Sequence, residues 1–188
     1  MRNSADYEKM IETTIDSETV FEGRVFKTVV KNVRLSDGTV SKREIVYHNG
    51  GACVLAIDDD LNCYMVHQFR SPFEKILLEV PAGKIEPGEE PLACAVRELH
   101  EEVGMRAEEM IDLGSEIVSP GYDSEIIWLY LARGLEYIGE APDEGEILNC
   151  EKIPLAELVR MADNGQIRDS KTMLCIYKAI RRLGLEQL

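Results

Sequence analysis

The chain has 188 residues, of which 45% are hydrophobic and 30% charged, and its formal net charge at pH 7 is −14. This length allows one sizeable core with a small appended element, and the composition is that of a folded protein, which excludes a disordered chain. Such a negative charge would repel nucleic-acid phosphates and anionic membranes, so neither nucleic-acid polymers nor membranes are expected as partners.

The N-terminal residues 1–18 are largely polar and lack the basic and apolar pattern of an export signal. No run approaches the roughly 20 apolar residues that a membrane span needs, so we expect a cytoplasmic protein. The cysteines are odd in number and scattered, which favours buried reduced thiols over disulfides or a zinc site. They are Cys53, Cys63, Cys94, Cys150 and Cys175.

Two β-branched runs predict a small N-terminal sheet. Residues 20–33 and 42–47 have the composition of strands, and residues 36–39 between them that of a hairpin turn. A sheet of two or three strands is marginal in water by itself. We therefore expect residues 1–47 to form a β-sheet element that packs against something else, and residues 48–188 to form the main domain.

Three further strands are predicted after the glycine pair at residues 50–51. Residues 52–57 form an apolar run typical of a buried strand, and residues 63–70 and 77–82 follow as the second and third strands. The turn at residues 58–62 contains three aspartates, but it lacks the glycine and the distal glutamate of a calcium-binding EF-hand loop. We interpret it as an ordinary turn.

Residues 83–105 read as a glycine-rich loop that leads into an acidic helix. We expect Glu89 and Glu90 in the first helical turn, where carboxylates complement the exposed N–H groups, with Pro91 near the start. Gly104 supplies the stop at the C-terminal end.

The helical repeat divides this helix into two faces. Glu98, Glu101 and Glu102 gather on one flank. At spacings of three and four residues they repel one another by a few tenths of a kcal/mol per pair; a cation would relieve this, and oxygen ligands suit Mg²⁺ or Mn²⁺. A merely solvated acidic face is the alternative. The apolar stripe expected to face the core consists of Leu92, Val96, Leu99 and Val103.

The rest of the chain continues the alternation of strands and helices. A strand is expected from residues 111–115 onward, a polar loop at 119–125, and a strongly apolar strand at 126–132. Residues 155–161 and 172–183 have the pattern of helices. This order predicts an α+β fold, an α/β/α sandwich around a mixed sheet.

The segment from Gly83 to Met105 resembles the Nudix box, G-x5-E-x7-R-E-U-x-E-E-x-G-U, in which U is a bulky apolar residue. It matches every specified position, and so long a pattern is far more specific than a short glycine motif. The chain is therefore similar to Nudix hydrolases, with a Nudix hydrolase domain at residues 48–188. The matching residues are Gly83, Glu89, Arg97, Glu98, Leu99, Glu101, Glu102, Gly104 and Met105.

Segments outside the box resemble the ADP-ribose and nucleotide-sugar pyrophosphatase branch of this family. In that branch a proline about 15 residues past the box marks ADP-ribose-type substrates, and Pro120 stands at that distance from Met105. One departure leaves the substrate open, because His67 stands where the branch commonly has arginine. The similar segments are residues 67–70, 78–83, 119–125, 142–146 and 164–172.

The resemblance implies roles for the box residues. Glu98 and Glu102 would be the main Mg²⁺ ligands, with Mn²⁺ as an alternative metal. Glu101 would support them, and the backbone carbonyl of Ala82 would complete the site. Arg97 would orient the glutamates of the helix.

The resemblance also implies roles outside the box. Glu125 would be a further metal ligand or the general base. Arg70 would bind phosphate, and Glu79 would accept a hydrogen bond from a hydroxyl or a base edge. Pro120 and Tyr122 would lie near the substrate, although Pro120 also suits an ordinary turn and Tyr122 ordinary loop packing.

The implied reaction is Mg²⁺-dependent hydrolysis of the diphosphate of ADP-ribose, a small nucleoside diphosphate, to AMP and ribose 5-phosphate. One alternative is a pyrophosphatase of GDP-mannose or of another nucleoside diphosphate derivative. Another is a non-catalytic Nudix-like nucleotide sensor, which the three retained helix glutamates and the absence of a basic DNA-binding region oppose. The branch also implies a homodimer, formed through the N-terminal sheet.

Overall fold

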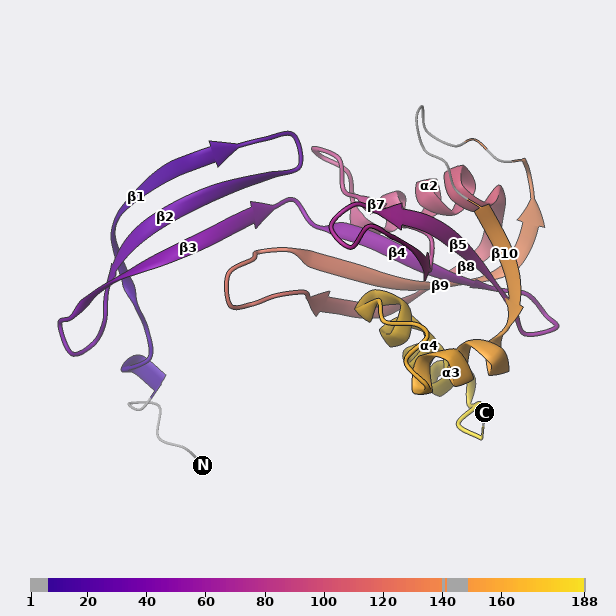
Figure 1. Ribbon diagram of the computed structural model, residues 1–188. Coiled ribbons are helices and arrows are strands. Elements are labelled where there is room, and N and C mark those ends of the chain that lie inside the picture. Colours follow the sequence, from indigo (N-terminus) through magenta and orange to yellow (C-terminus); the bar gives the residue numbers. More distant parts are fainter. Residues whose placement is uncertain (1–6, 140, 142–148, 188) are drawn as a thin grey trace. The chain divides into compact units, whose positions relative to one another are not determined.

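A computed structural model describes residues 7–139, 141 and 149–187 (Figure 1). The chain divides into two compact units, which are described separately. The first contains the chain up to Asn49 together with Ile117–Glu125, and the second contains Gly50–Glu116 and the chain from Ile126 onward. The segment at residues 142–146, which resembles the pyrophosphatase branch, lies outside the described residues.

The first unit is an antiparallel sheet in the order β1-β2-β3. The predicted hairpin joins β2 to β3, and Gly38 there has a left-handed φ of 88°. The single run predicted at residues 20–33 contains the end of β1 and most of β2. Every residue of β1 is exposed, so no alternation of buried and exposed positions marks it in the sequence. The strands are β1 (Thr13–Glu22), β2 (Phe26–Arg34) and β3 (Val40–His48).

The second unit is built on a seven-stranded sheet in the order β10-β5-β4-β9-β8, with β6 paired to β5 and β7 paired to β4. β4 runs parallel to β9 and antiparallel to β5 and β7, which confirms the predicted mixed sheet. Its strands are β4 (Gly51–Ile57), β5 (Asn62–Arg70), β6 (Lys75–Glu79), β7 (Ala82–Lys84), β8 (Met105–Ile117), β9 (Ile126–Tyr137) and β10 (Asn149–Pro154).

Three strand assignments in this sheet differ from the sequence prediction. β8 begins at Met105, six residues before the predicted start at residue 111. The strand predicted at residues 77–82 is divided between β6 and β7, which pair with different partners. Pro81 lies at the break, and it has no N–H group with which to continue a ladder. β10 was not predicted, because Ile153 is its one buried residue and the strand carries no apolar alternation.

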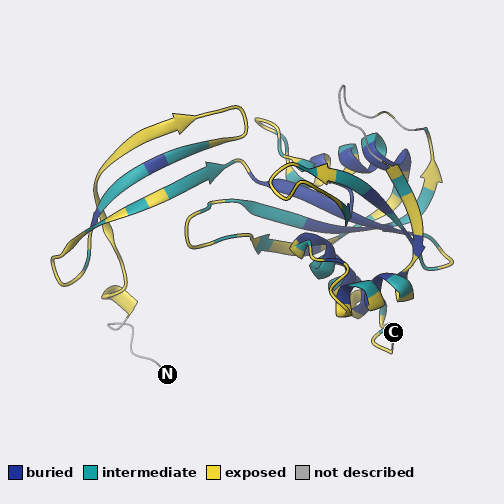
Figure 2. Ribbon diagram, in the orientation of Figure 1, coloured by how far each residue is buried: buried dark blue, intermediate teal, exposed yellow. Residues whose placement is uncertain are grey.

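Helices cover both faces of this sheet and form the predicted α/β/α layers. β4 is buried along its whole length (Figure 2). Ala52, Val54 and Ala56 share one core with residues of α2, whereas the alternate residues of β4 share the other core with residues of α3 and α4. The helices are α2 (Pro91–Val103), α3 (Leu155–Asp163) and α4 (Ser170–Leu183).

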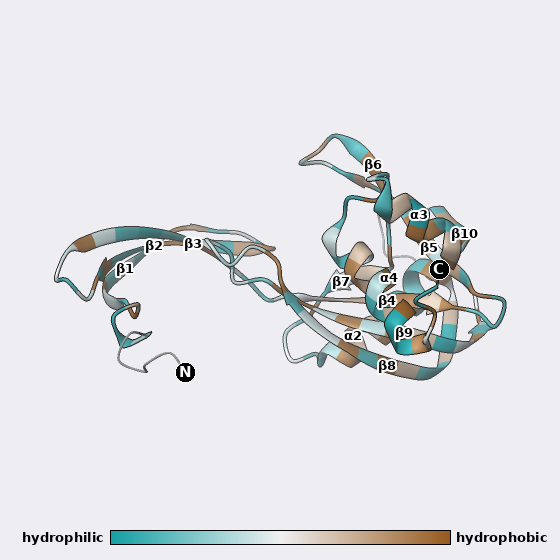
Figure 3. Cartoon of the chain, turned by 90° about the horizontal axis from the view of Figure 1, so that it is seen from below, coloured by the Kyte–Doolittle hydropathy of each residue, from teal (hydrophilic) through white to brown (hydrophobic). Residues whose placement is uncertain are grey.

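α3 and α4 are amphipathic, and both carry apolar and polar segments (Figure 3). Within the described ranges, no helix is long and apolar enough to cross a membrane. The cytoplasmic location stays a prediction. All five cysteines are free, and four of them are buried.

The ends of α2 are only partly as predicted. The helix begins at Pro91 with Glu90 at the N-cap, so Glu89 and Glu90 precede the first turn instead of filling it. The stop at Gly104 is confirmed: this residue has a left-handed φ of 70°, and its N–H donates to the carbonyl groups of His100 and Leu99.

The apolar stripe predicted on α2 is wrong at two of its four positions. Leu92 and Val96 are 46% and 45% exposed, whereas Leu99 and Val103 are 1% and 2% exposed. Two glutamates, Glu98 and Glu102, occupy part of the inward face of the helix. The hydrophobic periodicity therefore predicted the wrong position for this face. The buried residues of the helix are Cys94, Ala95, Glu98, Leu99, Glu102 and Val103.

This corrected face predicts different costs for two identical substitutions on α2. Leu99→Ala should lower the free energy of unfolding by about 2 to 5 kcal/mol, because it leaves a cavity in the core. Leu92→Ala should change it by less than about 0.5 kcal/mol, because that side chain is half exposed. Urea unfolding followed by circular dichroism measures both. Equal costs would contradict the assigned face.

Candidate active site

Arg97 holds the acidic side chains of the box loop and of α2 together. Its Nε and Nη2 donate to the two oxygens of Glu89, at 2.9 and 3.1 Å. Its Nη1 donates to Oε1 of Glu98 at 2.6 Å and to Oε2 of Glu101 at 2.8 Å. The Glu89 bonds contribute most to raising the pKa of Arg97, and they also lower the pKa of Glu89. This is the geometry that an orienting role for Arg97 requires.

Glu98 and Glu102 lie on the inward face of α2, where they are 7% and 5% exposed. Oε2 of Glu102 accepts a hydrogen bond from the backbone N–H of Ala82 at 2.9 Å. A Cβ atom at Gly83 would lie 1.6 Å from Oε1 of Glu98. The glycine of the box therefore makes room for the Glu98 carboxylate against β7.

The donor groups around α2 suit a hard divalent cation. Glu98, Glu102 and the carbonyl of Ala82 offer only oxygen atoms, as Mg²⁺ and Mn²⁺ prefer. In the part of the chain that the structure describes, no three His, Cys, Asp or Glu side chains are grouped around a common metal position. Arg97 instead bonds to Glu98 and Glu101, so a cation would compete with its guanidinium. The metal ligands stay a prediction.

A second cluster of charges joins β5, β6 and α4. Arg70 forms a bidentate pair with Glu79, in which Nε donates to Oε1 at 2.8 Å and Nη2 to Oε2 at 2.7 Å. The Lys171 ammonium also donates to Oε2 of Glu79. Glu79 is 2% exposed and Lys171 7% exposed. The acceptor predicted to face a substrate is thus engaged by two cations of the protein.

Asp169 fixes the other side of Lys171. Its Oδ2 accepts from the Lys171 Nζ at 2.9 Å, and it caps α4 by accepting from the backbone N–H and the hydroxyl of Thr172 at 3.0 and 2.6 Å. The Thr172 hydroxyl in turn accepts from the N–H of Val80 at 3.0 Å. The start of α4 is therefore tied to the end of β6.

These contacts set the protonation of Glu79. Burial alone would raise its pKa, but the hydrogen bonds from Arg70 and the charge of Lys171 outweigh burial and lower the pKa from 4.5 to about 2. Asp169 and Glu79 raise the pKa of Lys171 despite its burial. Both groups are charged at neutral pH.

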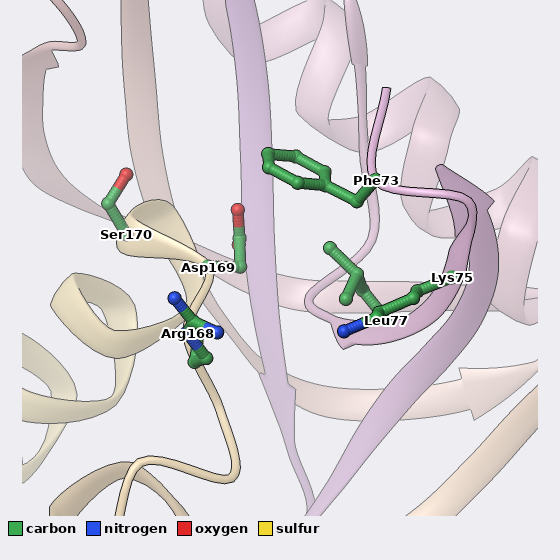
Figure 4. Close-up of a pocket in the computed structure, with 6 residues that line it drawn as sticks. All are labelled: Phe73, Lys75, Leu77, Arg168, Asp169 and Ser170. Atoms are coloured by element: carbon green, nitrogen blue, oxygen red, sulfur yellow. The ribbon is translucent and has the colours of Figure 1, made fainter. Parts of the chain in front are cut away.

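A pocket of about 410 Å³ lies beside this cluster (Figure 4). Two cations, Lys75 and Arg168, come from its opposite walls. The sequence analysis selected none of its lining residues as a site, although residues 164–172 resemble the pyrophosphatase branch. One wall consists of Phe73, Lys75 and Leu77, and the other of Arg168, Asp169 and Ser170.

The remaining predicted site residues belong to the first unit. Oε1 of Glu125 lies 3.2 Å from Nδ1 of His48, and the N–H of His48 donates to the Ser124 hydroxyl at 3.0 Å. Tyr122 is 57% exposed, and Pro120 is also exposed. Because Glu125, Pro120 and Tyr122 lie in a different unit from the glutamates of α2, their joint role stays a prediction. The sequence analysis did not identify His48 as the partner of Glu125.

His67, the departure from the usual pyrophosphatase pattern, has a partner in the structure. Its Nε2 lies 2.7 Å from Oε2 of Glu151 on β10, and Glu151 is half exposed. His67 thus contacts the carboxylate of a residue on the neighbouring strand. Such a cross-strand pair is an ordinary structural contact of a sheet surface. Within residues 67–70, Arg70 is therefore the residue that bonds to the buried carboxylate of Glu79.

Comparisons with known proteins agree with the box. The NUDIX domain family model matches residues 47–174. The chain is 44% identical to the methanol dehydrogenase activator of Bacillus methanolicus and 39% identical to the ADP-ribose pyrophosphatase of Bacillus subtilis (strain 168), in each case over 88% of this chain and 90% of the relative. It is 30% identical to the GDP-mannose pyrophosphatase of Cronobacter sakazakii (strain ATCC BAA-894), over 89% and 92%.

A solved structure titled "Crystal structure of ADP compounds hydrolase" has the same fold. It superposes with a TM-score of 0.83 at 24% identity and covers 93% of this chain and 96% of that one. The α+β architecture with a mixed sheet is therefore shared.

Lowering the pH should destabilise the protein through Glu79. A carboxyl whose pKa falls on folding contributes fully above its ordinary pKa of 4.5, and the contribution is lost as the pH falls toward 2. The gap in unfolding free energy between the wild type and Glu79→Gln should therefore shrink by on the order of 2 kcal/mol from pH 6 to pH 3. Urea unfolding at both pH values measures the gap.

The same substitution at exposed Glu90 controls for the loss of one negative charge. A gap between the wild type and Glu79→Gln that does not change with pH would contradict the assigned ionisation of Glu79.

Proposed function

The chain belongs to the NUDIX domain family as a hydrolase, and on that premise we propose that it cleaves the diphosphate of ADP-ribose to AMP and ribose 5-phosphate with Mg²⁺. The observation that carries this proposal is the box itself. Its arginine, Arg97, organises Glu89, Glu98 and Glu101, and Glu102 is fixed against the backbone of Ala82. The 39% identity to an ADP-ribose pyrophosphatase supports the substrate.

The residues of α2 would hold the metal. Glu98 and Glu102, with support from Glu101 and the carbonyl of Ala82, supply the oxygen ligands. Arg97 keeps the carboxylates of Glu98 and Glu101 in place, and the N–H of Ala82 keeps that of Glu102 in place. When bound, Mg²⁺ polarises the phosphoryl oxygens, neutralises developing charge and makes bound water a stronger nucleophile. A chain with a net charge of −14 needs such a cation to accept a diphosphate at all.

The other proposed residues bind the substrate or move a proton. Arg70 binds a phosphate oxygen with the part of its guanidinium that Glu79 leaves open, since no described residue bonds to its Nη1. Glu125 takes the proton of the attacking water or adds a ligand oxygen. Tyr122 and Pro120 line the nucleoside side, where Tyr122 is exposed enough to stack on a base.

Two other functions have support in the comparisons. GDP-mannose is the first alternative substrate, and the 30% identity to a GDP-mannose pyrophosphatase supports it less than the 39% identity supports ADP-ribose. A second candidate is activation of an alcohol dehydrogenase, which the 44% identity to a methanol dehydrogenase activator supports. A non-catalytic sensor is disfavoured because all the box glutamates are retained.

The experiment that decides among these is a hydrolysis panel with identified products. ADP-ribose, ADP-glucose, GDP-mannose, NADH and diadenosine polyphosphates are each incubated with the protein and Mg²⁺, and then with Mn²⁺. We expect ADP-ribose to have the highest kcat/KM. Comparable rates on all substrates would reduce the proposal to a general nucleoside diphosphate hydrolase. Adding the protein to a methanol dehydrogenase assay tests the second candidate.

Glu102→Gln should lower kcat by about two orders of magnitude or more, because it removes a charged ligand while keeping the side-chain shape. Turnover of ADP-ribose at saturating Mg²⁺ measures the effect. Glu90→Gln is the matched control: Glu90 lies in the same segment, is exposed and makes no side-chain capping bond. Its turnover should stay within about twofold of the wild type. A near-normal rate for Glu102→Gln would remove this residue from the proposed site.

We also propose that residues 1–47 form a dimerisation element. Between Thr13 and His48, six large apolar side chains are each more than 40% exposed, and exposed apolar groups of this kind are typical of interaction surfaces. A two-fold partner would bury them. They are Ile15, Val20, Phe21, Val25, Phe26 and Val40.

Size-exclusion chromatography with light scattering should therefore give a mass of twice 21.2 kDa at micromolar concentration. The expected reason is burial of the apolar groups of the first unit between two copies. A stable monomer under these conditions would refute the dimer.

A further inference from the structure

We propose that Lys171 is a positioning residue for Arg70 and acts on it through Glu79. The inference rests on the proposed function, because it takes Arg70 as the group that binds the substrate diphosphate. Lys171 lies outside the box, and it is not among the site residues predicted from the sequence. A residue at the start of α4 would then contribute to substrate binding.

The Glu79 carboxylate is held from two sides. Arg70 on β5 takes both oxygens in a bidentate pair, and Lys171 on α4 takes Oε2 as well. A carboxylate that binds a single arginine can still swing with it, whereas one that is also fixed by an ammonium from another element cannot. The bidentate geometry then transmits this fixed orientation to the plane of the guanidinium.

Exposure changes in one direction along the cluster. The side chain of Glu79 is 2% exposed, that of Lys171 is 9% exposed, and that of Arg70 is 36% exposed. Arg70 is therefore the end of the cluster that a substrate can reach. Glu79 and Lys171 lie behind it, so neither is expected to touch the substrate.

The charges show why Lys171 matters for phosphate binding. Arg70 and Lys171 carry two positive charges, and Glu79 and Asp169 carry two negative ones. Without the ammonium, the three remaining groups of the cluster, Arg70, Glu79 and Asp169, would together carry a net negative charge. That charge would repel a diphosphate, and the effect would be strong because Glu79, which carries part of it, is buried. Lys171 thus leaves the charge of Arg70 available to the substrate.

The position of Lys171 is itself fixed by the start of α4. Asp169 accepts from its ammonium while also capping the helix through Thr172. The Thr172 hydroxyl accepts from the N–H of Val80, next to Glu79. The ammonium, the carboxylate and the strand that carries the carboxylate are therefore held in one frame.

A purely structural ion pair would behave differently from a positioning residue. Removing it would lower stability but would leave the binding of substrate by folded protein unchanged. A positioning residue acts on KM, and it does so only while the residue that it positions is present. A double-mutant cycle between Lys171 and Arg70 separates these two roles.

The cycle uses full-length protein with ADP-ribose and Mg²⁺. Lys171→Met should raise KM about tenfold with kcat within about threefold, because binding and not chemistry is weakened. In an Arg70→Ala background, Lys171→Met should change KM by less than about twofold. Lys171→Arg, which keeps the charge, should recover most of the lost affinity. Lys178→Met, the same substitution on the same helix, should leave KM within about twofold of the wild type.

The outcomes separate this inference from the proposed function. If Arg70→Ala raises KM and Lys171→Met raises it by the same factor in both backgrounds, the positioning role is wrong while the phosphate role of Arg70 stands. If Arg70→Ala leaves KM unchanged, both are wrong. Thermal unfolding shows whether each variant is folded at the assay temperature. Should Lys171→Met be unfolded there, Lys171→Gln replaces it in the same cycle with the same two expected results.

Discussion

Buried negative charge is the constraint on which the second unit depends. Burying a carboxylate is costly unless cations or N–H groups compensate it, and Glu79, Glu98 and Glu102 are each less than 10% exposed. The structure compensates them locally: Arg70 and Lys171 bond to Glu79, Arg97 bonds to Glu98, and a backbone N–H bonds to Glu102. Arg97 is the sequence neighbour of Glu98, but the groups that compensate Glu79 and Glu102 lie 9 to 92 residues away in the sequence, so the fold must assemble before those charges are satisfied.

The short break between β6 and β7 brings the two charged clusters together. Val80 donates its N–H to Thr172 at the start of α4, whereas Ala82 donates its N–H to Glu102 on α2. Pro81 between them has no N–H, and its carbonyl accepts from Val54 of β4. Three consecutive residues thus bond in turn to one helix layer, to the central strand and to the other helix layer. In a continuous strand, the N–H groups of Val80 and Ala82 would instead have donated hydrogen bonds to a neighbouring strand.

The sequence predicted the site best where a motif specifies the residue types, and it predicted the buried face of α2 poorly, where only hydrophobic periodicity was available. The box fixes nine positions, so the loop, the helix and the glutamates of α2 could be predicted, and the family comparison agrees. Periodicity failed on the same helix, because Glu98 and Glu102 face inward and displaced the apparent apolar stripe toward Leu92 and Val96. β1 is exposed along its whole length and β10 has one buried residue, so neither strand shows an apolar alternation. For this reason only the end of β1 and no part of β10 was predicted. No local pattern marks Lys171 as the partner of a residue 92 positions away.

This arrangement divides the proposed roles between the two compact units of the chain. The residues proposed to hold metal and those proposed to hold phosphate are joined through residues 79–83, with hydrogen bonds to both helix layers, so their spacing is fixed by the core of one unit. A loose cluster could not keep a phosphate-binding guanidinium aligned with metal-held oxygens, because small displacements of such groups cost large factors in rate. Glu125, Pro120 and Tyr122 instead lie on a loop of the other unit, anchored to β3 by backbone bonds at Val46. Substitutions that change substrate preference are therefore expected to be tolerated best in that loop, while residues 79–83 admit almost none.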